Sequence, residues 1–302
     1  MNQQFLTELK AVTAENRIFT DEPMKKHTTF RVGGPADILV QPKGTELAAV
    51  IRLCREYDVP YQVIGNGSNL LVGDRGIRGL VIEMLSKEDE ICVEDDCITV
   101  GAGMLLSKTA NRAAEHGLTG MEFAAGIPGR IGGAVVMNAG AYGGEMKDIL
   151  TAVTVLDQEG NEKILSAEEL ELGYRTSCIL KKGYIVTGAK IKLKHGEETA
   201  IRARMEELKK QRVEKQPLEY PSAGSTFKRP EGYFAGKLIM DAGLRGYLVG
   251  EAQVSEKHCG FVINRGNATA ADVRTLMQNV ADIVEEKFGV RLEPEVKMIG
   301  EF

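Results

Sequence analysis

The sequence predicts an α+β fold in two parts, and three observations support this prediction. The chain has 302 residues, which at about 150 residues per domain is enough for two domains. Apolar segments typical of strands alternate with segments typical of helices as far as His195. Beyond that residue a strongly charged helix begins. We therefore expect an N-terminal helical segment over residues 1–27, a first domain over 28–195 and a smaller α+β domain over 196–302.

The elements of the first domain follow from the spacing of their apolar side chains. In residues 45–58, Leu47, Ile51 and Cys54 would share one face of a helix that begins at a Thr45 cap. The same reasoning predicts a helix over residues 104–116, ended by Gly117, and strands over residues 61–64, 79–84, 97–101, 151–157, 163–165 and 184–194. The turn QEGN joins two of these strands into a hairpin.

The second domain contains two expected helices and a closing strand. Residues 197–214 predict a helix with a charged, solvent-facing side. Residues 269–288 predict another helix, because Thr269 and Asp272 occupy capping positions and Gly289 would end it. A last strand is expected over residues 290–299.

Composition excludes several classes of protein. The balance of 38 basic against 43 acidic residues gives no support for a nucleic-acid-binding surface. No apolar run approaches the roughly 20 residues needed to cross a bilayer, and the polar, amphipathic N-terminus does not resemble a secretory signal. We expect a soluble, cytoplasmic protein with no metal site. The five cysteines form no CxxC pair, so we expect reduced structural thiols: Cys54, Cys92, Cys97, Cys178 and Cys259.

Two glycine-rich segments are the strongest functional signals. Residues 65–69 read GNGSN directly after an expected strand, where glycine permits positive φ and lets backbone N–H groups approach an anion. Leu70 stands where a dinucleotide-binding GxGxxG fingerprint needs its third glycine, so this loop is not that motif. A plain turn at the end of a strand would also explain it.

The second segment, residues 124–144, has seven glycines in 21 positions. A glycine costs up to about 1 kcal/mol at each helical position, so a ligand pressed against the backbone is the expected compensation. A flexible linker is the alternative. Ile127, Ile131 and Val135 make the segment too apolar for a solvated linker.

Five motifs together resemble the UDP-N-acetylenolpyruvoylglucosamine reductase family. They are GNGSNLLV (65–72), EFAAGIPGRIGGAVVMNAGAYGGE (122–145), GYRTS (173–177), AGSTFKRP (223–230) and LEPEV (292–296). The resemblance is collinear from about Thr28 onward. It implies an FAD-binding domain of the vanillyl-alcohol-oxidase type followed by a smaller substrate-binding domain. It also implies the shorter form of the family, which lacks an extra loop bearing a tyrosine.

The resemblance implies an activity in peptidoglycan precursor synthesis. NADPH would reduce FAD, and flavin N5 would then pass the hydride to UDP-N-acetylglucosamine enolpyruvate, giving UDP-N-acetylmuramate. We expect non-covalent FAD, because neither glycine segment contains the His or Cys that covalent attachment needs. The residues expected to hold FAD are Gly65, Asn66, Gly67, Ser68, Asn69, Leu70, Gly126, Ile127, Pro128, Gly129, Gly132, Gly133, Ala134 and Asn138.

Three catalytic residues are implied. Arg175 matches the active-site arginine, whose planar guanidinium can hold a carboxylate and stabilise its enolate-like form. Ser225 matches the serine that protonates the carbanion, although a turn serine after Gly224 is the alternative from chemistry alone. The resemblance assigns the third role to Glu295, whereas its strand position alone would not distinguish it from Glu293.

Substrate contacts are expected from four residues: Lys215, Lys228, His258 and Asn264. The two lysines also fit a solvated basic stretch, and His258 also fits a surface histidine. Arg229 stands where many relatives place asparagine, which puts the pattern of phosphate contacts in doubt. Tyr220 or Tyr233 could replace the contact of the missing tyrosine loop.

Two other functions remain open at this stage. The first is another flavin oxidoreductase of the same FAD fold, acting on a small hydroxyacid or alcohol, which would leave AGSTFKRP unexplained. The second is a flavin- or nucleotide-sugar-binding sensor. A sensor would have no need to keep Arg175, Ser225 and Glu295 together.

Overall fold

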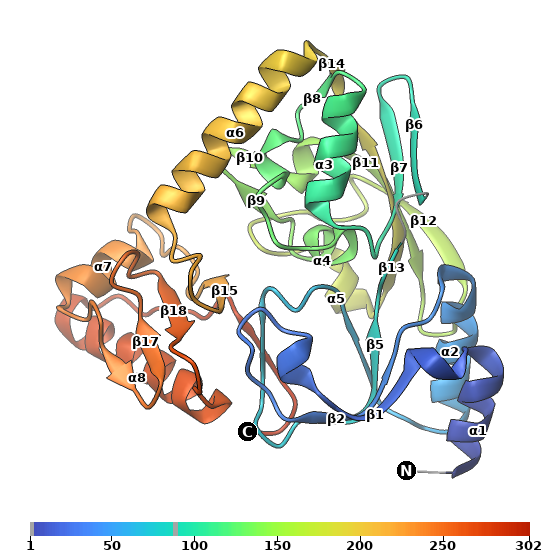
Figure 1. Ribbon diagram of the computed structural model, residues 1–302, viewed down its shortest axis with the longest axis horizontal. Helices are drawn as coiled ribbons and strands as arrows, with labels where there is room; N and C mark the ends of the chain where they lie inside the picture. The colour runs from blue at the N-terminus through green and yellow to red at the C-terminus, as the bar shows by residue number, and fades with distance from the viewer. Residues whose placement is uncertain (1–2, 87–89) are drawn as a thin grey trace. The chain divides into compact units, whose positions relative to one another are not determined.

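The computed structural model describes residues 3–86 and 90–302. Its backbone contacts divide the chain into two compact units, each made of three stretches. Unit 1 comprises Met1–Phe19, Ile38–Asn66 and Gly79–Arg212, and unit 2 comprises Thr20–Asp37, Gly67–Arg78 and Val213–Phe302. The element order is shown in Figure 1.

The largest sheet of unit 1 is antiparallel and has five strands. In sheet order these are β12 (Glu162–Ser166), β11 (Leu150–Leu156), β13 (Ile185–Lys192), β7 (Cys97–Gly101) and β6 (Ile91–Glu94). The expected β11–β12 hairpin is confirmed, with Val153 opposite Leu165. Two helices pack into the same apolar core, α3 (Leu106–Glu115) and α4 (Ile131–Val136). The sheet and these helices support the second glycine-rich segment, which contains α4.

A second sheet has the order β1-β2-β5-β3. Its strands are β1 (Ile18–Pro23), β2 (Pro35–Val40), β5 (Ile77–Glu83) and β3 (Tyr61–Ile64). β3 and β5 run parallel, with Ile64 opposite Glu83. Helices α1 (Gln3–Val12) and α2 (Gly44–Glu56) lie side by side (Figure 1) and bury Phe5, Leu9 and Ile51. The first glycine loop, residues 65–69, begins directly after the carboxyl end of β3.

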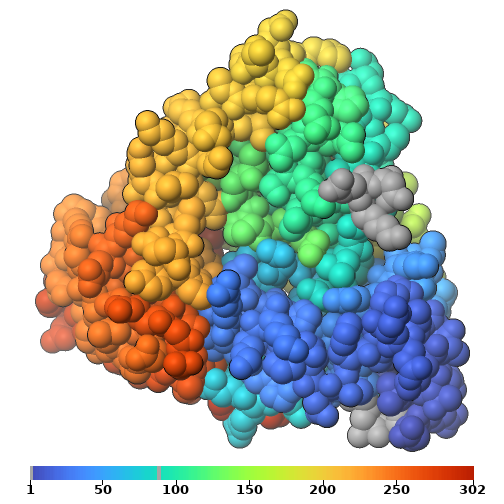
Figure 2. Space-filling model, in the orientation of Figure 1, coloured from blue at the N-terminus to red at the C-terminus, as the bar shows by residue number. Residues whose placement is uncertain are grey.

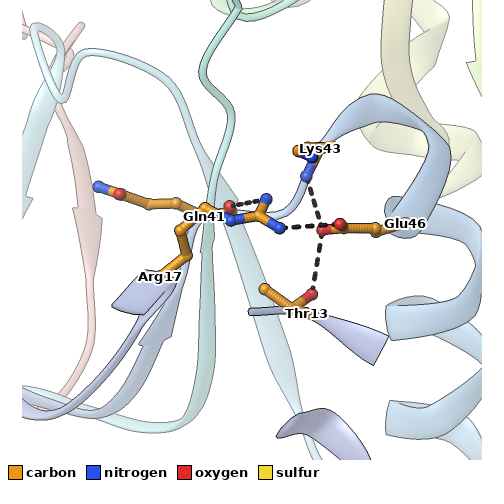
Figure 3. A network of polar contacts seen from close by, with 5 residues as sticks. All are labelled: Thr13, Arg17, Gln41, Lys43 and Glu46. Atoms are coloured by element: carbon orange, nitrogen blue, oxygen red, sulfur yellow. Dashed lines mark hydrogen bonds and ion pairs between the residues drawn. The ribbon is translucent and has the colours of Figure 1, made fainter. Parts of the chain in front are cut away.

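A polar network joins the start of α2 to the segment after α1 (Figure 3). The Glu46 carboxylate accepts from Arg17 Nη2 at 2.8 Å, from the Lys43 backbone N–H at 2.9 Å and from Thr13 Oγ1 at 3.3 Å. Arg17 Nη1 also donates to the Gln41 carbonyl at 3.0 Å. The helix begins at Gly44, so the expected Thr45 cap is wrong; Glu46 closes the first turn instead.

Unit 2 contains a four-stranded antiparallel sheet covered by two helices. The sheet order is β15 (Ser222–Ser225), β18 (Phe261–Asn264), β17 (Ala252–Val254) and β16 (Leu248–Val249), and the helices are α7 (Ala235–Asp241) and α8 (Ala270–Phe288). The predicted caps of α8 are confirmed: Thr269 and Asp272 bond reciprocally, and Gly289 has φ 66°.

Most of the remaining α-helices and strands are short. They are β4 (Leu70–Val72), β8 (Leu118–Thr119), β9 (Gly140–Ala141), β10 (Gly144–Glu145), α5 (Cys178–Lys182), β14 (Lys194–His195), α6 (Glu198–Lys215, a longer charged helix) and β19 (Lys297–Ile299). β19 pairs in parallel with β4 within unit 2. Many residues of α6 are exposed, and the helix forms part of the gold surface in Figure 2.

Some predicted boundaries differ from those of the structure. The sequence suggested a domain boundary at residue 195. In the structure, α6 belongs to unit 1 as far as Arg212, because Ile201 is buried and Arg212 packs on Gly126. The expected strand over residues 290–299 is regular only at β19. Pro294, which has no N–H to donate, forms only an isolated bridge with Phe227.

All five cysteines are free thiols. Within the described residues, no helix is both long and apolar enough to span a membrane.

Candidate functional site

The first glycine loop presents unpaired backbone donors. Gly67 has φ 58°, and a Cβ there would lie 2.0 Å from the His27 carbonyl oxygen, so the close approach of two backbones requires glycine. Among the described residues, no acceptor takes the backbone N–H of Asn66, Gly67 or Ser68. Consecutive free N–H groups form a concavity suited to an anion.

The second glycine loop is bonded to the first. Asn66 Nδ2 donates to the Pro128 carbonyl at 2.8 Å. Gly132 is explained by packing, because a Cβ there would lie 3.2 Å from Ala102 Cβ. Gly133 is not, since a Cβ there would meet no atom within 4 Å. A helical glycine with open space beside it leaves the backbone accessible to a flat ligand, and the residues present therefore fit a bound flavin nucleotide.

Arg130 belongs to the second glycine-rich segment and reaches the first glycine loop, a role that was not predicted from the sequence. Its side chain packs on Gly65, its Nη1 donates to the Gly103 carbonyl at 2.6 Å, and its buried Nε has no partner. Burial lowers the pKa of this guanidinium, which the charge of Glu83 partly opposes. In the sequence, the signal for this residue was a single arginine within the glycine-rich motif GIPGRIGG.

Arg212 is a second guanidinium next to a motif glycine. A Cβ at Gly126 would lie 3.2 Å from Arg212 Nη1. Burial lowers the pKa of Arg212, with a smaller opposing effect from Tyr142. The glycine-rich segment therefore has half-buried positive charge on more than one side.

Arg175 lies in a tight turn. The Gly173 N–H donates to the Thr176 carbonyl at 3.1 Å, and the Thr176 N–H donates back at 3.3 Å. Arg175, third in the turn, has φ 54°, a conformation that costs a non-glycine residue about 1–2 kcal/mol. Its half-buried guanidinium donates to the Gly140 carbonyl at 3.4 Å and stacks over Tyr174. Unit 1 thus brings Arg175 to the second glycine-rich segment.

Asn138 has a different environment from the one its expected role requires. Its fully buried side chain makes three hydrogen bonds, to Glu145 Oε2, the Gly173 carbonyl and the Lys147 N–H. Because these bonds use both amide N–H groups, a direct contact between its side chain and FAD is unsupported.

Ser225 is presented by a β-bulge in unit 2. Ser222 pairs with Ile263 and Ser225 with Phe261, so one extra residue lies in β15. Gly224 has φ 76° at this point, which glycine adopts without strain. The bulge leaves Ser225 exposed while its neighbour Thr226 is fully buried. A bulge that re-aims one side chain is frequent beside active sites.

Glu295 lies on the segment next to Ser225. Its backbone N–H donates to the Thr226 carbonyl at 2.8 Å, and the residue is half-buried. Glu293 instead forms an ion pair with Lys228 at 2.9 Å, which lowers the pKa of Glu293. Of the two glutamates, Glu295 is thus the one whose backbone bonds to the residue next to Ser225, whereas the Glu293 backbone bonds farther along, at Lys228.

The expected substrate residues lie in varied surroundings. Asn264 is buried, with Nδ2 bonded to the Phe30 carbonyl and Oδ1 accepting from Gly266 and Ala268, so its side chain braces a loop. His258 is half-buried, accepts at Nδ1 from the Gly260 N–H and contacts the Phe261 ring edge-on.

Burial lowers the pKa of His258, and the ring therefore tends to be neutral. Lys215 is exposed at the end of α6. Arg229 stacks on Phe234 at 4.0 Å, and both Tyr220 and Tyr233 are exposed. Among the described residues, no cluster of His, Cys, Asp or Glu could hold a metal ion.

Comparison with known proteins places this geometry in a family. Residues 36–166 match a family model described as FAD binding domain. Residues 216–299 match the model of the UDP-N-acetylenolpyruvoylglucosamine reductase C-terminal domain. The expected fold class, an FAD-binding domain with a C-terminal α+β domain, is therefore confirmed.

Relatives of that name resemble the chain over its full length. One from Agathobacter rectalis is 57% identical over 100% of both chains, and one from Caldanaerobacter subterraneus subsp. tengcongensis is 52% identical over 100% of both. The crystal structure of UDP-N-acetylenolpyruvylglucosamine reductase from Thermus caldophilus superposes with a TM-score of 0.78 and 41% identity, covering 91% of this chain and 97% of the other. The chain therefore belongs to the UDP-N-acetylenolpyruvoylglucosamine reductase family, whose members are FAD-dependent oxidoreductases.

Proposed function

We propose that this enzyme uses NADPH to reduce the enolpyruvyl ether of UDP-N-acetylglucosamine enolpyruvate, giving the peptidoglycan precursor UDP-N-acetylmuramate. The observation with most weight is the turn of Arg175, whose guanidinium bonds to the Gly140 carbonyl within the flavin-type glycine segment. A carboxylate held by Arg175 would place the substrate's double bond next to the cofactor that these glycines fit.

FAD would be held non-covalently by the two glycine loops. The free N–H groups of Asn66, Gly67 and Ser68 suit its diphosphate, and Arg130 adds positive charge beside Gly65. The open side of Gly133 leaves room for a flat ring. The chemistry that FAD supplies when bound is hydride transfer, first from NADPH and then from N5 to the methylene carbon of the substrate.

The protein's own groups would manage charge and proton. Negative charge builds on the carbon next to the substrate carboxylate, where the fixed guanidinium of Arg175 stabilises it. Ser225, aimed outward by its bulge, donates a proton to that carbon. Glu295 assists this transfer from the neighbouring segment.

The test is anaerobic spectroscopy of the purified holoprotein. We expect NADPH to bleach the yellow flavin and the enolpyruvyl substrate to restore the colour, with a product two hydrogens heavier by mass spectrometry. Reoxidation by oxygen but not by this substrate would favour an oxidase of the same fold. Yellow colour that stays in the pellet after acid precipitation would contradict non-covalent binding.

A further inference from the structure

We propose that Asn138 is a positioning residue that fixes the Arg175 turn onto the glycine-rich segment. This proposal rests on the function proposed above, because it concerns the residue assigned to the substrate carboxylate. It replaces the role of cofactor ligand that the sequence suggested for Asn138.

The first argument is how fully the Asn138 amide is used. Nδ2 donates to Glu145 Oε2 at 2.9 Å and to the Gly173 carbonyl at 3.1 Å, while Oδ1 accepts from the Lys147 N–H at 2.9 Å. The side chain is completely buried. Because both N–H donors of this buried amide are used, none is left for a ligand. Removing the amide would leave its partners without these hydrogen bonds, which costs free energy.

The second argument is where the bond to Gly173 lies. Gly173 opens the turn, and its carbonyl accepts from both Thr176 within the turn and Asn138 outside it. On either side, Arg175 Nη2 donates to the Gly140 carbonyl and Ser177 Oγ donates to the Val136 carbonyl. Three bonds thus connect residues 136–140 to residues 173–177, and the Asn138 bond is the one at the base of the turn.

The third argument is conformational. Arg175 has φ 54°, which an L-residue keeps only where its surroundings hold it. Asn138 has φ 42°, a region that asparagine tolerates better than most residues. Aspartate in its place would lose both donors and face the Glu145 carboxylate. The side chain and backbone of Asn138 are thus both matched to this position.

The experiment is a double-mutant cycle read on separate half-reactions by stopped-flow absorbance. Asn138→Ala should slow reoxidation of reduced flavin by the substrate about 10- to 10²-fold, since a small misplacement of a reacting group has effects of that order. Reduction by NADPH and FAD affinity should change less than about threefold. In an Arg175→Ala background, Asn138→Ala should add almost nothing, because the positioned group is gone.

Asn161→Ala is the matched control. Asn161 also donates from its side-chain amide within unit 1, but to Asp157 in the turn between β11 and β12. It should leave both half-reactions unchanged.

Several outcomes overturn the proposal. These are equal slowing of both half-reactions, weaker FAD binding by Asn138→Ala, and effects of the two substitutions that simply multiply. If Asn138→Ala does not yield folded holoprotein, Asn138→Gly takes its place in the cycle, because glycine also lacks the amide and adopts φ 42° without strain. If neither variant retains FAD while Asn161→Ala does, Asn138 serves the fold or the cofactor and the proposal fails. Failure of the proposed function is seen separately, in wild-type flavin that the substrate does not reoxidise.

Discussion

At the scale of single residues, Arg175 combines a disfavoured backbone with a side chain that only arginine supplies. Lysine would keep the positive charge and lose the planar fork that matches a carboxylate. The guanidinium should therefore stabilise the transition state of the reaction more than it stabilises the bound substrate.

Arg175→Lys should slow substrate-dependent flavin reoxidation by about 10²- to 10³-fold, as when one preorganised donor is removed from a developing anion. Substrate KM should rise only modestly, and reduction by NADPH should be preserved. Steady-state kcat and KM at saturating NADPH check this. A raised KM with unchanged kcat would instead mark Arg175 as a uniform binding anchor.

Ser225 should matter in one half-reaction only. Ser225→Ala should leave NADPH-driven flavin reduction intact, because that step needs no protonation of the substrate carbon. Reoxidation by the substrate should slow by about 10²-fold or more, within the range for positioned acids. Stopped-flow absorbance separates the steps, and equal slowing of both would mean that the serine is structural.

Arg130 is expected to act on affinity for the cofactor's diphosphate. Arg130→Gln should weaken FAD binding by about 10- to 10²-fold, because a hydrogen bond to a charged group contributes roughly 1.5–3 kcal/mol. Riboflavin, which has no phosphate, should bind both proteins alike; fluorescence titration of apoprotein measures both ligands.

The control for Arg130 is Arg204→Gln, which removes an exposed guanidinium paired with Glu207 on α6. An equal loss of affinity for FAD and riboflavin would show that Arg130 supports the fold and not the diphosphate.

At the scale of elements, the polar network at the start of α2 gives a pH-dependent contribution to stability. Burial alone would raise the pKa of Glu46, but the bonds from Arg17, Lys43 and Thr13 outweigh it and the pKa is lowered. A carboxyl whose folded pKa lies below its unfolded value stabilises the fold above the unfolded pKa and loses this as pH falls.

Glu46→Gln should therefore lower the free energy of unfolding by about 1–3 kcal/mol at pH 7. The difference from wild type should shrink as pH falls below the ordinary glutamate value of 4.5. Urea unfolding at several pH values measures this. Glu206→Gln, in an exposed pair with Lys209, should change stability by less than about 1 kcal/mol. A pH-independent difference for Glu46→Gln would contradict the charge argument.

Elements with local signals could be predicted from the sequence. The caps of α8, the β11–β12 hairpin and β3 follow from Thr269, the QEGN turn and a short apolar run. The start of α2 could not, because the bonding of Glu46 depends on Arg17, which is distant in sequence. The Gly224 bulge and the bonds of Asn138 were likewise hidden, since pairing register and burial decide them.

At the scale of the whole molecule, the buried and exposed thiols report on global unfolding. Burial raises the pKa of Cys54 to about 12, whereas Cys92 is exposed. A thiol reagent near neutral pH should therefore modify Cys92 quickly and Cys54 only when the chain unfolds. Counting reactive thiols in native buffer and in urea tests this. Cys92→Ser should remove the fast phase, and native labelling of Cys54 at the rate of Cys92 would refute the assignment.

The two-unit organisation is the part that the sequence predicted least well. A boundary at residue 195 treats each unit as one continuous stretch, yet residues 20–37 and 67–78 belong to unit 2. Nothing local to these stretches indicates this, because the partner of Leu71 is Met298, at the other end of the chain. The family motifs indicated the class of reaction, but they did not indicate that residues 20–37 and 67–78 belong to unit 2.

The pairing of β4 with β19 has a consequence for how the chain is made. Leu70 leaves the ribosome roughly 225 residues before its partner Lys297, which at about 5–20 residues per second is a wait of roughly 10–45 s. Every stretch of unit 1 has been synthesised by Arg212, so that unit can fold while translation continues. The apolar run Leu70–Val72 must meanwhile stay unpaired, and it is during this interval that the nascent protein would most need a chaperone to cover it.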